Sequence, residues 1–467
     1  MKHTLQCFDR LNCCTRFMIL GLLLLGSTSA YAVPSFARQT GMACAACHTM
    51  FPELTPFGRE FKLNGYVISN LKTVSDITLN KQDTLELNQL PPVSAMFQTS
   101  LTTTAKRLPD SSGLPNAYAA NGTVQFPQEA SLFLAGKIAP EIGAFIQLTY
   151  GSADGTIGFD NADIRYAHNM SNANRNLVVG VTLNNNPTVQ DAWNSTPAWG
   201  FPYSGSEAAP APAAGTQIDG GLEQAVGGAS AYFWWNNSVY GEAGVYRTSP
   251  QGFANPTTEG NGPLDSSAEA VMKGVAPYWR FAYQKQWDRN SLEVGTYGMY
   301  MELYPGGGLP LSGPTDKFTD LSADAQYQYI GDENIFTVDS SYTHEDQSLG
   351  ATYAMGGSNA KDTLQTLKVV GNYYYRRKYG LSLGFVDTWG TTDPLVYAPE
   401  DVVGSRTGSP NSEAFVAQAS YLPWLNTKFV LQYVAYAKFN GSSSNYDGSG
   451  RSAADNNTLF LLGWLNF

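Results

Sequence analysis

From Ser94 to the end of the chain, apolar and polar residues alternate in short segments of about ten residues. The alternation is clearest over 428–437 and 131–138, and small residues blur it elsewhere. A period of two predicts strands that present successive side chains to opposite faces, and about ten residues suffice for a tilted strand to cross an outer membrane. We predict roughly sixteen strands, near 94–106, 130–139, 142–150, 161–169, 177–183, 227–235, 238–247, 277–287, 291–300, 320–330, 335–344, 364–374, 380–388, 413–421, 428–437 and 458–467.

The connections between these segments alternate between short and long. Short turns lie at 140–141, 236–237, 288–290, 331–334 and 376–379. Long loops rich in Gly, Pro and Ser lie at 107–129, 184–226, 248–276, 301–319, 345–363, 389–412 and 438–457, with a shorter one at 151–160. Outer-membrane barrels have short periplasmic turns and long outer loops. The sequence therefore predicts an all-β fold: one porin-like antiparallel barrel of about 16 strands over 94–467, with both termini in the periplasm.

The C-terminal segment supports a closed barrel. It ends in Phe467 and places Leu459, Leu461 and Leu465 on one strand face. A closed barrel pairs its last strand with its first and leaves no edge. The terminal Phe resembles the assembly signal of outer-membrane proteins, with Leu465 where that signal often has Tyr. A soluble sandwich does not explain the alternating connections.

Residues 1–32 read as a secretory leader. Lys2, Arg10 and Arg16 precede an apolar run at 18–25, and a cleavage pattern with small residues at positions 30 and 32 follows. We predict that this leader is removed in the mature protein. Its apolar run is too short for a spanning helix, so no transmembrane helix is expected. Its removal changes the net charge from −11 to −13, because it contains three basic residues and one acidic residue.

The composition agrees with many short strands, since 46 Gly, 27 Tyr and 23 Phe accompany only 14% charged residues. The acidic balance argues against a nucleic-acid partner and favours cationic ones. The long loops, together with 151–160, contain 21 Asp and Glu against 7 Lys and Arg, which would concentrate a dication at the barrel mouth. Solvated outer loops are often acidic, so we assign no metal site to these carboxylates.

The cysteines point to a haem. Three of the five lie in the leader, so the exported chain retains only Cys44 and Cys47, within the pattern Cys44-x-x-Cys47-His48. This is the attachment pattern of c-type haem, in which two thiols form thioethers and the adjacent histidine is the proximal iron ligand. The alternatives are a chance match and a redox disulfide. We predict one covalent haem c.

The residues around this pattern predict a small haem domain over 33–76, joined by a linker at 77–93 to the barrel. Residues 51–65 predict one or two helical turns that place Phe57 and Phe61 on one face, against the haem edge. Arg38, Arg59 and Lys62 are candidates to pair with the haem propionates, or else to face water. A domain of this size lacks a sufficient core of its own, so we expect it to plug the barrel lumen.

The sequence offers several candidates for the distal iron ligand. His168 and His344 are the only other histidines of the exported chain, and Met42 and Met50 lie too close to the proximal loop to reach the opposite haem face easily. Met96 shares the polar, lumenal face of the first strand. A thioether there is a candidate ligand that would raise the haem potential, and ordinary lumen packing is the alternative.

Residues 36–41 (FARQTG), 51–62 (FPELTPFGREFK) and 180–202 (GVTLNNNPTVQDAWNSTPAWGFP) closely resemble the fused monohaem cytochrome-porins of iron-oxidising bacteria. The resemblance covers both parts of the chain and implies that Cys44 and Cys47 hold the haem and that His48 ligates its iron. It also implies an outer-membrane oxidoreductase that takes electrons from extracellular Fe(II) and passes them to a periplasmic c-type cytochrome.

Two other functions remain open at this stage. The chain could be a solute porin with a structural or sensory haem, for which an open, conducting pore would be the evidence. It could also be an electron conduit for another donor, such as a reduced sulfur compound, an organic mediator or a mineral surface.

Overall fold

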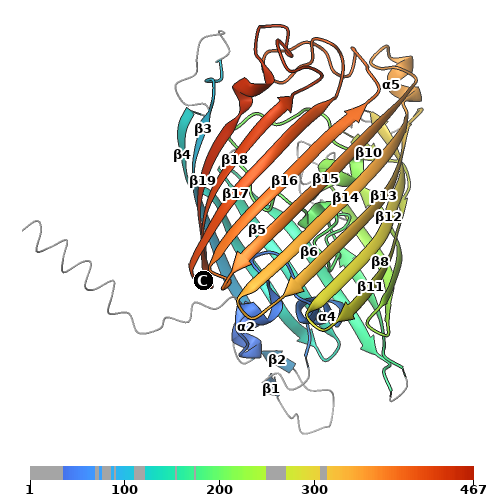
Figure 1. Ribbon diagram of the computed structural model, residues 1–467. Helices are drawn as coiled ribbons and strands as arrows, with labels where there is room; N and C mark the ends of the chain where they lie inside the picture. The colour runs from blue at the N-terminus through green and yellow to red at the C-terminus, as the bar shows by residue number, and fades with distance from the viewer. Residues whose placement is uncertain are drawn as a thin grey trace, which may run out of the picture.

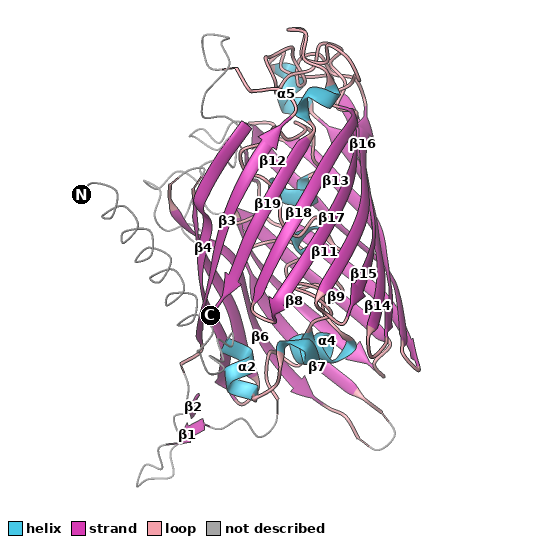
Figure 2. Cartoon of the chain, turned by 60° about the vertical axis from the view of Figure 1, so that its left-hand side comes forward, coloured by secondary structure: helices cyan, strands magenta, loops and turns pink. Residues whose placement is uncertain are grey.

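The structure, a computed structural model, is a closed antiparallel β-barrel (Figures 1 and 2). It describes residues 35–68, 73–75, 86–88, 91–109, 121–152, 155–172, 175–248, 270–305 and 313–467. The predicted leader lies outside these residues, as does most of the predicted linker. The barrel strands are β3 (Val93–Thr104), β4 (Asn121–Ala139), β5 (Ile142–Gly151), β6 (Ile157–Asn169), β7 (Leu177–Asn184), β8 (Val226–Trp235), β9 (Val239–Thr248), β10 (Ala270–Met272), β11 (Ala276–Trp287), β12 (Asn290–Pro305), β13 (Asp316–Ile330), β14 (Asn334–Ser348), β15 (Lys361–Tyr375), β16 (Tyr379–Gly390), β17 (Ser412–Trp424), β18 (Thr427–Lys438) and β19 (Thr458–Asn466).

The barrel closes because β19 pairs with β3 and β9 pairs with β11. The short β10 pairs with β12 just beyond the end of β11, so the two share one strand position. Each of the sixteen predicted segments therefore matches one strand position. Several observed strands are longer than predicted: β4 begins at Asn121 rather than near 130, because ladder hydrogen bonds to β3 continue where the apolar alternation has ended.

Two of the short turns have the same backbone conformation. Asn236 and Asn237 have φ of 49° and 53°, and Arg376 and Arg377 have φ of 52° and 53°. In each turn the following residue donates a backbone hydrogen bond of 3.0 Å to the last residue of the preceding strand. Asn is well suited to such positive φ values, and Arg is not. Something other than turn propensity therefore accounts for the two arginines.

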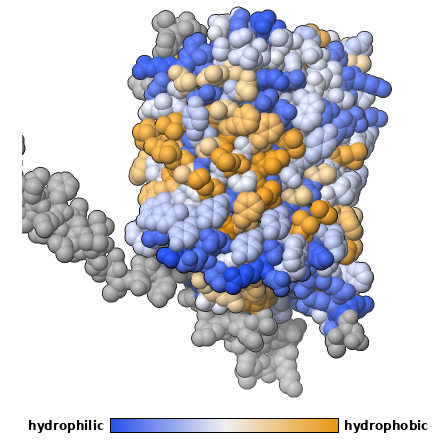
Figure 3. Space-filling view, viewed as in Figure 1, coloured by the Kyte–Doolittle hydropathy of each residue, from blue (hydrophilic) through white to orange (hydrophobic). Residues whose placement is uncertain are grey.

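The outer surface of the barrel carries an apolar band. In β18, Phe429, Leu431 and Tyr433 are exposed, whereas Val430 and Gln432 point inward and are buried. Figure 3 shows this band in orange, with polar surface towards both ends of the barrel. No helix among the described residues is long and apolar enough to cross a membrane. A closed sheet with an outward apolar band has the properties of an outer-membrane barrel, which the chain forms.

The connection between β7 and β8 lies inside the barrel, which corrects the prediction that 184–226 is an outer loop. We call residues 185–225 the inner loop. Its residues 189–196 are buried, and Trp193 is fully so. The loop is held by polar contacts, since Asp191 lies 3.0 Å from Arg280 of β11 and Trp193 donates through Nε1 to Gln284. Its Gly, Pro and Ser content resembles that of a solvated loop, and the lumenal partners that bury it are distant in sequence.

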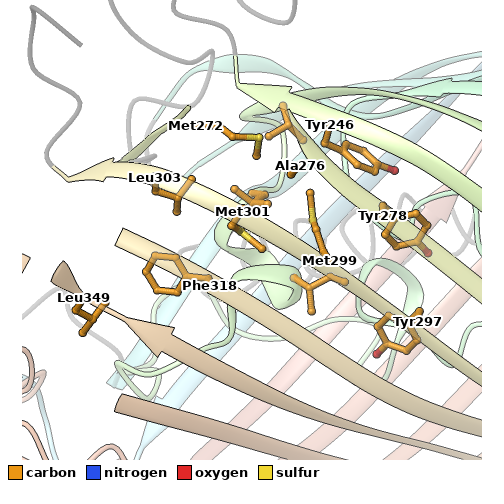
Figure 4. Packing of buried hydrophobic residues seen from close by; sticks show 13 residues of the cluster. Tyr246, Met272, Ala276, Tyr278, Tyr297, Met299, Met301, Leu303, Phe318 and Leu349 are labelled. Atoms are coloured by element: carbon orange, nitrogen blue, oxygen red, sulfur yellow. The ribbon is translucent and has the colours of Figure 1, made fainter. Parts of the chain in front are cut away.

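The inner loop also covers an apolar patch on the lumenal wall. Ile218 and Leu222 of the loop pack with buried side chains of the wall, which include Tyr246, Tyr278, Met299 and Phe318 (Figure 4). A lumen filled by water would leave these side chains exposed. The inner loop therefore provides part of a core within the barrel.

The N-terminal helices lie at the end of the barrel that holds the short turns and the C-terminus, which is the periplasmic end (Figures 1 and 2). They are α2 (Ser35–Thr40), α3 (Cys44–Cys47) and α4 (Pro56–Leu63), and a two-stranded sheet of β1 (Thr73–Ser75) and β2 (Glu86–Asn88) follows. We call residues 35–66 the plug. Its contacts with the wall include hydrogen bonds from Lys428 of β18 to Phe51 (3.0 Å) and from Tyr232 of β8 to Leu63 (2.7 Å).

Candidate haem site

The haem-attachment pattern forms a single helical turn whose carbonyls all accept hydrogen bonds. His48 donates its backbone N–H to Cys44 (2.9 Å). Thr55 donates its hydroxyl to Ala46 (2.6 Å) and its backbone N–H to Cys47 (2.8 Å). The carbonyls of Ala45 and His48 accept from the Arg377 guanidinium, at 2.7 and 3.0 Å. The segment is thus held by a plug residue and by a barrel turn.

Helix α4 packs very close to this turn. A Cβ atom added to Gly58 would lie 2.3 Å from the Cys47 carbonyl oxygen, so only glycine fits there. Thr55 caps α4 by accepting from the Gly58 N–H (3.2 Å). Gly58 therefore sets the spacing between α4 and the attachment pattern.

His48 has the arrangement of an iron ligand. Its Nδ1 lies 3.2 Å from the Pro52 carbonyl oxygen, so a tautomer with the proton on Nδ1 leaves Nε2 available. Its ring contacts Phe51, with the centroids 4.7 Å apart. Burial lowers the pKa of His48 to about 4, which favours the neutral form that binds metals.

The two thiols are free and lie one helical turn apart. Burial raises the pKa of Cys44, and it raises the pKa of Cys47 to about 11, with a smaller contribution from Cys44. Reactive dithiols in redox disulfide motifs have lowered pKa values. The raised pKa values of these two thiols therefore differ from those typical of redox disulfide motifs.

A cavity of about 530 Å³ adjoins these groups, within the ~300–1,000 Å³ of typical ligand sites. Near Cys44, Cys47 and His48 its lining is apolar and aromatic, and it includes Phe57 and Phe61 as predicted from their spacing. Further lining residues come from the barrel wall and the inner loop: Met96, Phe133, Phe145, Gln147, Asp160, Asn186, Trp199 and Glu223. A flat apolar macrocycle with polar substituents matches such a lining. The residues present fit a c-type haem.

The candidates for the distal ligand are separated by the structure. Met96 is buried on the cavity lining, where Gln98 donates to its sulfur at 3.4 Å. Met42 also lines the cavity, whereas Met50 packs against the wall elsewhere. His168 and His344 lie away from the cavity, paired with Glu141 and Asp346. Ligation by Met96 stays a prediction.

The three predicted propionate partners lie in different places. Lys62 lines the cavity, donates to the Val189 carbonyl (2.7 Å) and lies 4.8 Å from the Trp199 ring centroid. Burial, aided by Arg165, lowers the Lys62 pKa to about 7.

Arg59 and Arg38 do not line the cavity. Arg59 is buried against the wall and donates to Ser291, Gln326 and Gln328 at 2.7–2.8 Å. Arg38 donates to the Val93 carbonyl. Both cations hold the plug in the barrel, and only Lys62 is placed to meet a propionate.

Sequence reasoning missed the contribution of the inner loop. Asn194 accepts from the Leu54 N–H (3.0 Å), and Tyr203 donates to Glu53 (2.8 Å). Glu53 is fully buried and also accepts from Asn372 of β15 (2.8 Å), so it joins plug, inner loop and wall. The available signal was the cluster of Trp, Asn and Asp at 190–199 in a segment assigned to solvent.

No protein-family model and no curated protein matches the chain. Its structure is similar to those of the outer-membrane channel DcaP of Acinetobacter baumannii (10% identity, 80% of this chain and 96% of that one, TM-score 0.42) and the anion-selective porin of Comamonas acidovorans (12%, 80% and 98%, 0.46). It is also similar to the outer-membrane protein OmpT of Vibrio cholerae (11%, 80% and 96%, 0.41). With TM-scores this low, the barrel assignment rests on the strand pairing itself.

Proposed function

We propose that this outer-membrane barrel is an electron-transfer protein, an oxidoreductase that carries one covalent c-type haem on Cys44 and Cys47. The observation that carries the proposal is the position of His48 beside both thiols, with Nδ1 facing a carbonyl and an apolar cavity adjoining them. The haem would supply one-electron chemistry through its iron. The chain would orient His48, exclude water and insulate the redox centre from lipid.

The donor we propose is extracellular Fe(II), and the acceptor is a periplasmic c-type cytochrome. A barrel crosses an apolar layer of ~25 Å, so electrons could pass inward while iron stays outside. The acidic outer loops favour a dication, although four of the carboxylates counted among them in the sequence lie in the inner loop: Asp191, Glu207, Asp219 and Glu223. Of these, Asp191 and Asp219 pair with Arg280 and Lys368. At the periplasmic end, Met42 and Phe57 line the cavity and are 37% and 39% exposed, which gives an acceptor access.

Stopped-flow reduction of the purified oxidised protein by Fe(II) tests this proposal. We expect the absorbance spectrum of the wild type to change promptly from oxidised to reduced haem. When Cys44 and Cys47 are both replaced by Ala, we expect no covalent haem staining. A haem that stays oxidised in excess Fe(II) but accepts electrons from another donor would exclude iron and retain the conduit. Staining that survives the double replacement would exclude the attachment site.

A solute porin with a structural or sensory haem is the second candidate, favoured by the porin-type barrel. It requires a conducting lumen. The plug and the inner loop oppose it, because they contact each other through Leu54 and Asn194 and through Lys62 and Val189 inside the barrel. Single-channel recording in planar bilayers separates the two functions: stable open-channel conductance supports the porin.

A further inference from the structure

Arg377 is the one barrel residue whose side chain donates to the haem-attachment pattern, among the hydrogen bonds of the described residues. It lies 329 positions beyond His48, in the turn between β15 and β16. From there its Nη1 donates to the carbonyls of Ala45 and His48. The contact therefore joins the two parts of the chain at the proposed axial ligand.

The backbone conformation of this turn does not favour an arginine at position 377. Its φ of 53° lies in the left-handed region, which disfavours a long side chain. The turn at 236–238 has the same conformation and uses Asn at both left-handed positions. Arg376 faces the same backbone constraint, but its guanidinium pairs with Glu333 at the surface (2.6 Å).

We propose that Arg377 is a positioning residue that fixes the His48 segment and raises the reduction potential of the haem. The inference rests on the proposed function. A guanidinium stays cationic at any working pH. Oxidised haem carries one more positive charge than reduced haem, so a fixed cation beside the axial ligand disfavours the oxidised form.

The partial burial of Arg377 makes this charge effective. Its guanidinium is half-buried and bonds to backbone carbonyls, and no carboxylate of the described residues forms an ion pair with it. An exposed cation would be screened by salt, and one paired with a carboxylate would be largely neutralised. The charge thus acts on the haem site more than that of its neighbour Arg376.

The test compares Arg377→Asn with Arg376→Asn in the full-length protein. Asn suits the left-handed backbone at both positions, so neither replacement strains the turn. We expect Arg377→Asn to lower the equilibrium constant for haem reduction three- to tenfold, or ~28–59 mV at 59 mV per decade. Arg376→Asn should leave the reduction potential unchanged within experimental error. Arg377→Lys retains the positive charge, so its potential should lie close to that of the wild type.

Spectroelectrochemical titration measures the potential, and heat-modifiable migration on a gel reports barrel assembly. Loss of covalent haem in an assembled Arg377→Asn barrel, with haem retained in Arg376→Asn, would also support the proposal. Equal potentials in the wild type and both Asn variants would overturn it, as would failure of Arg377→Asn alone to assemble. A wild-type protein without haem would refute the proposed function itself, which is a separate outcome.

Discussion

The buried ion-pair network that holds the inner loop gives a sharp prediction. Arg280 of β11 lies 3.0 Å from Asp191 of the loop and 2.8 Å from Asp324 of β13, and all three side chains are buried. Arg280→Met retains much of the side-chain volume and removes the charge. Glu293 of β12 lies 3.5 Å from Arg280 as well, so three buried carboxylates are then left without their cation, although Asp191 still accepts from backbone N–H groups of the loop.

Breaking a buried pair of this kind costs about 3–5 kcal/mol. At ~1.4 kcal/mol per tenfold change, the population of barrels with a detached inner loop should rise at least ~10²-fold. The exposed pair of Arg289 and Asp332 is also 2.8 Å apart, and it is the matched control, because an exposed pair contributes at most ~1 kcal/mol. Arg289→Met should therefore behave like the wild type.

Two measurements report detachment: proteolysis within 185–225, and ion conductance in planar bilayers. Both should rise in Arg280→Met and stay unchanged in Arg289→Met. An assembled Arg280→Met barrel with wild-type proteolysis and conductance would refute the reasoning, since it would mean that other contacts hold the loop. The bond from Trp193 to Gln284 would then be the next to examine.

Three further predictions follow from the site and the topology. Gly58→Ala should destabilise the plug by ~1–3 kcal/mol through the clash with the Cys47 carbonyl, seen as haem absorbance lost at a lower temperature; equal thermal stability would contradict the close packing. Met96→Ala should lower the haem potential and remove any sulfur-to-iron absorption, and an unchanged spectrum would assign the distal position to another group. Labelling of intact cells should reach cysteines introduced at 389–412 but not at 376–378, and the opposite pattern would invert the topology.

The barrel was predictable from the sequence because strand alternation is local. In β18, ten consecutive residues are enough to show which side chains face inward and which face outward. The turn at 236–237 can be predicted from two adjacent Asn residues. The attachment pattern was equally local, since five consecutive residues contain both thiols and the histidine. The start of β4 was not predicted, because its pairing with β3 begins in a segment whose Gly, Pro and Asn content is typical of a loop.

The inner loop and the placement of the arginines depended on partners far away in sequence. Asp191 is buried in an ion pair with Arg280 of β11, and a single carboxylate in a polar segment gives no sign of that partner. Arg59 was a candidate for the haem, yet three polar wall residues accept hydrogen bonds from its two Nη atoms. The partners of these side chains are set by residues that are close only in the folded structure, so a pattern in the sequence does not reveal them.

The bonds of the plug to distant strands bear on the order of events in assembly. Its partners lie on β8, β13, β15 and β18 and on the turn that holds Arg377, so they come together only when the sheet is curved and closed. The plug precedes every one of these strands in the chain. The contacts of the plug are therefore of high contact order, and we expect its docking to be slow and to be coupled to closure of the seam between β19 and β3.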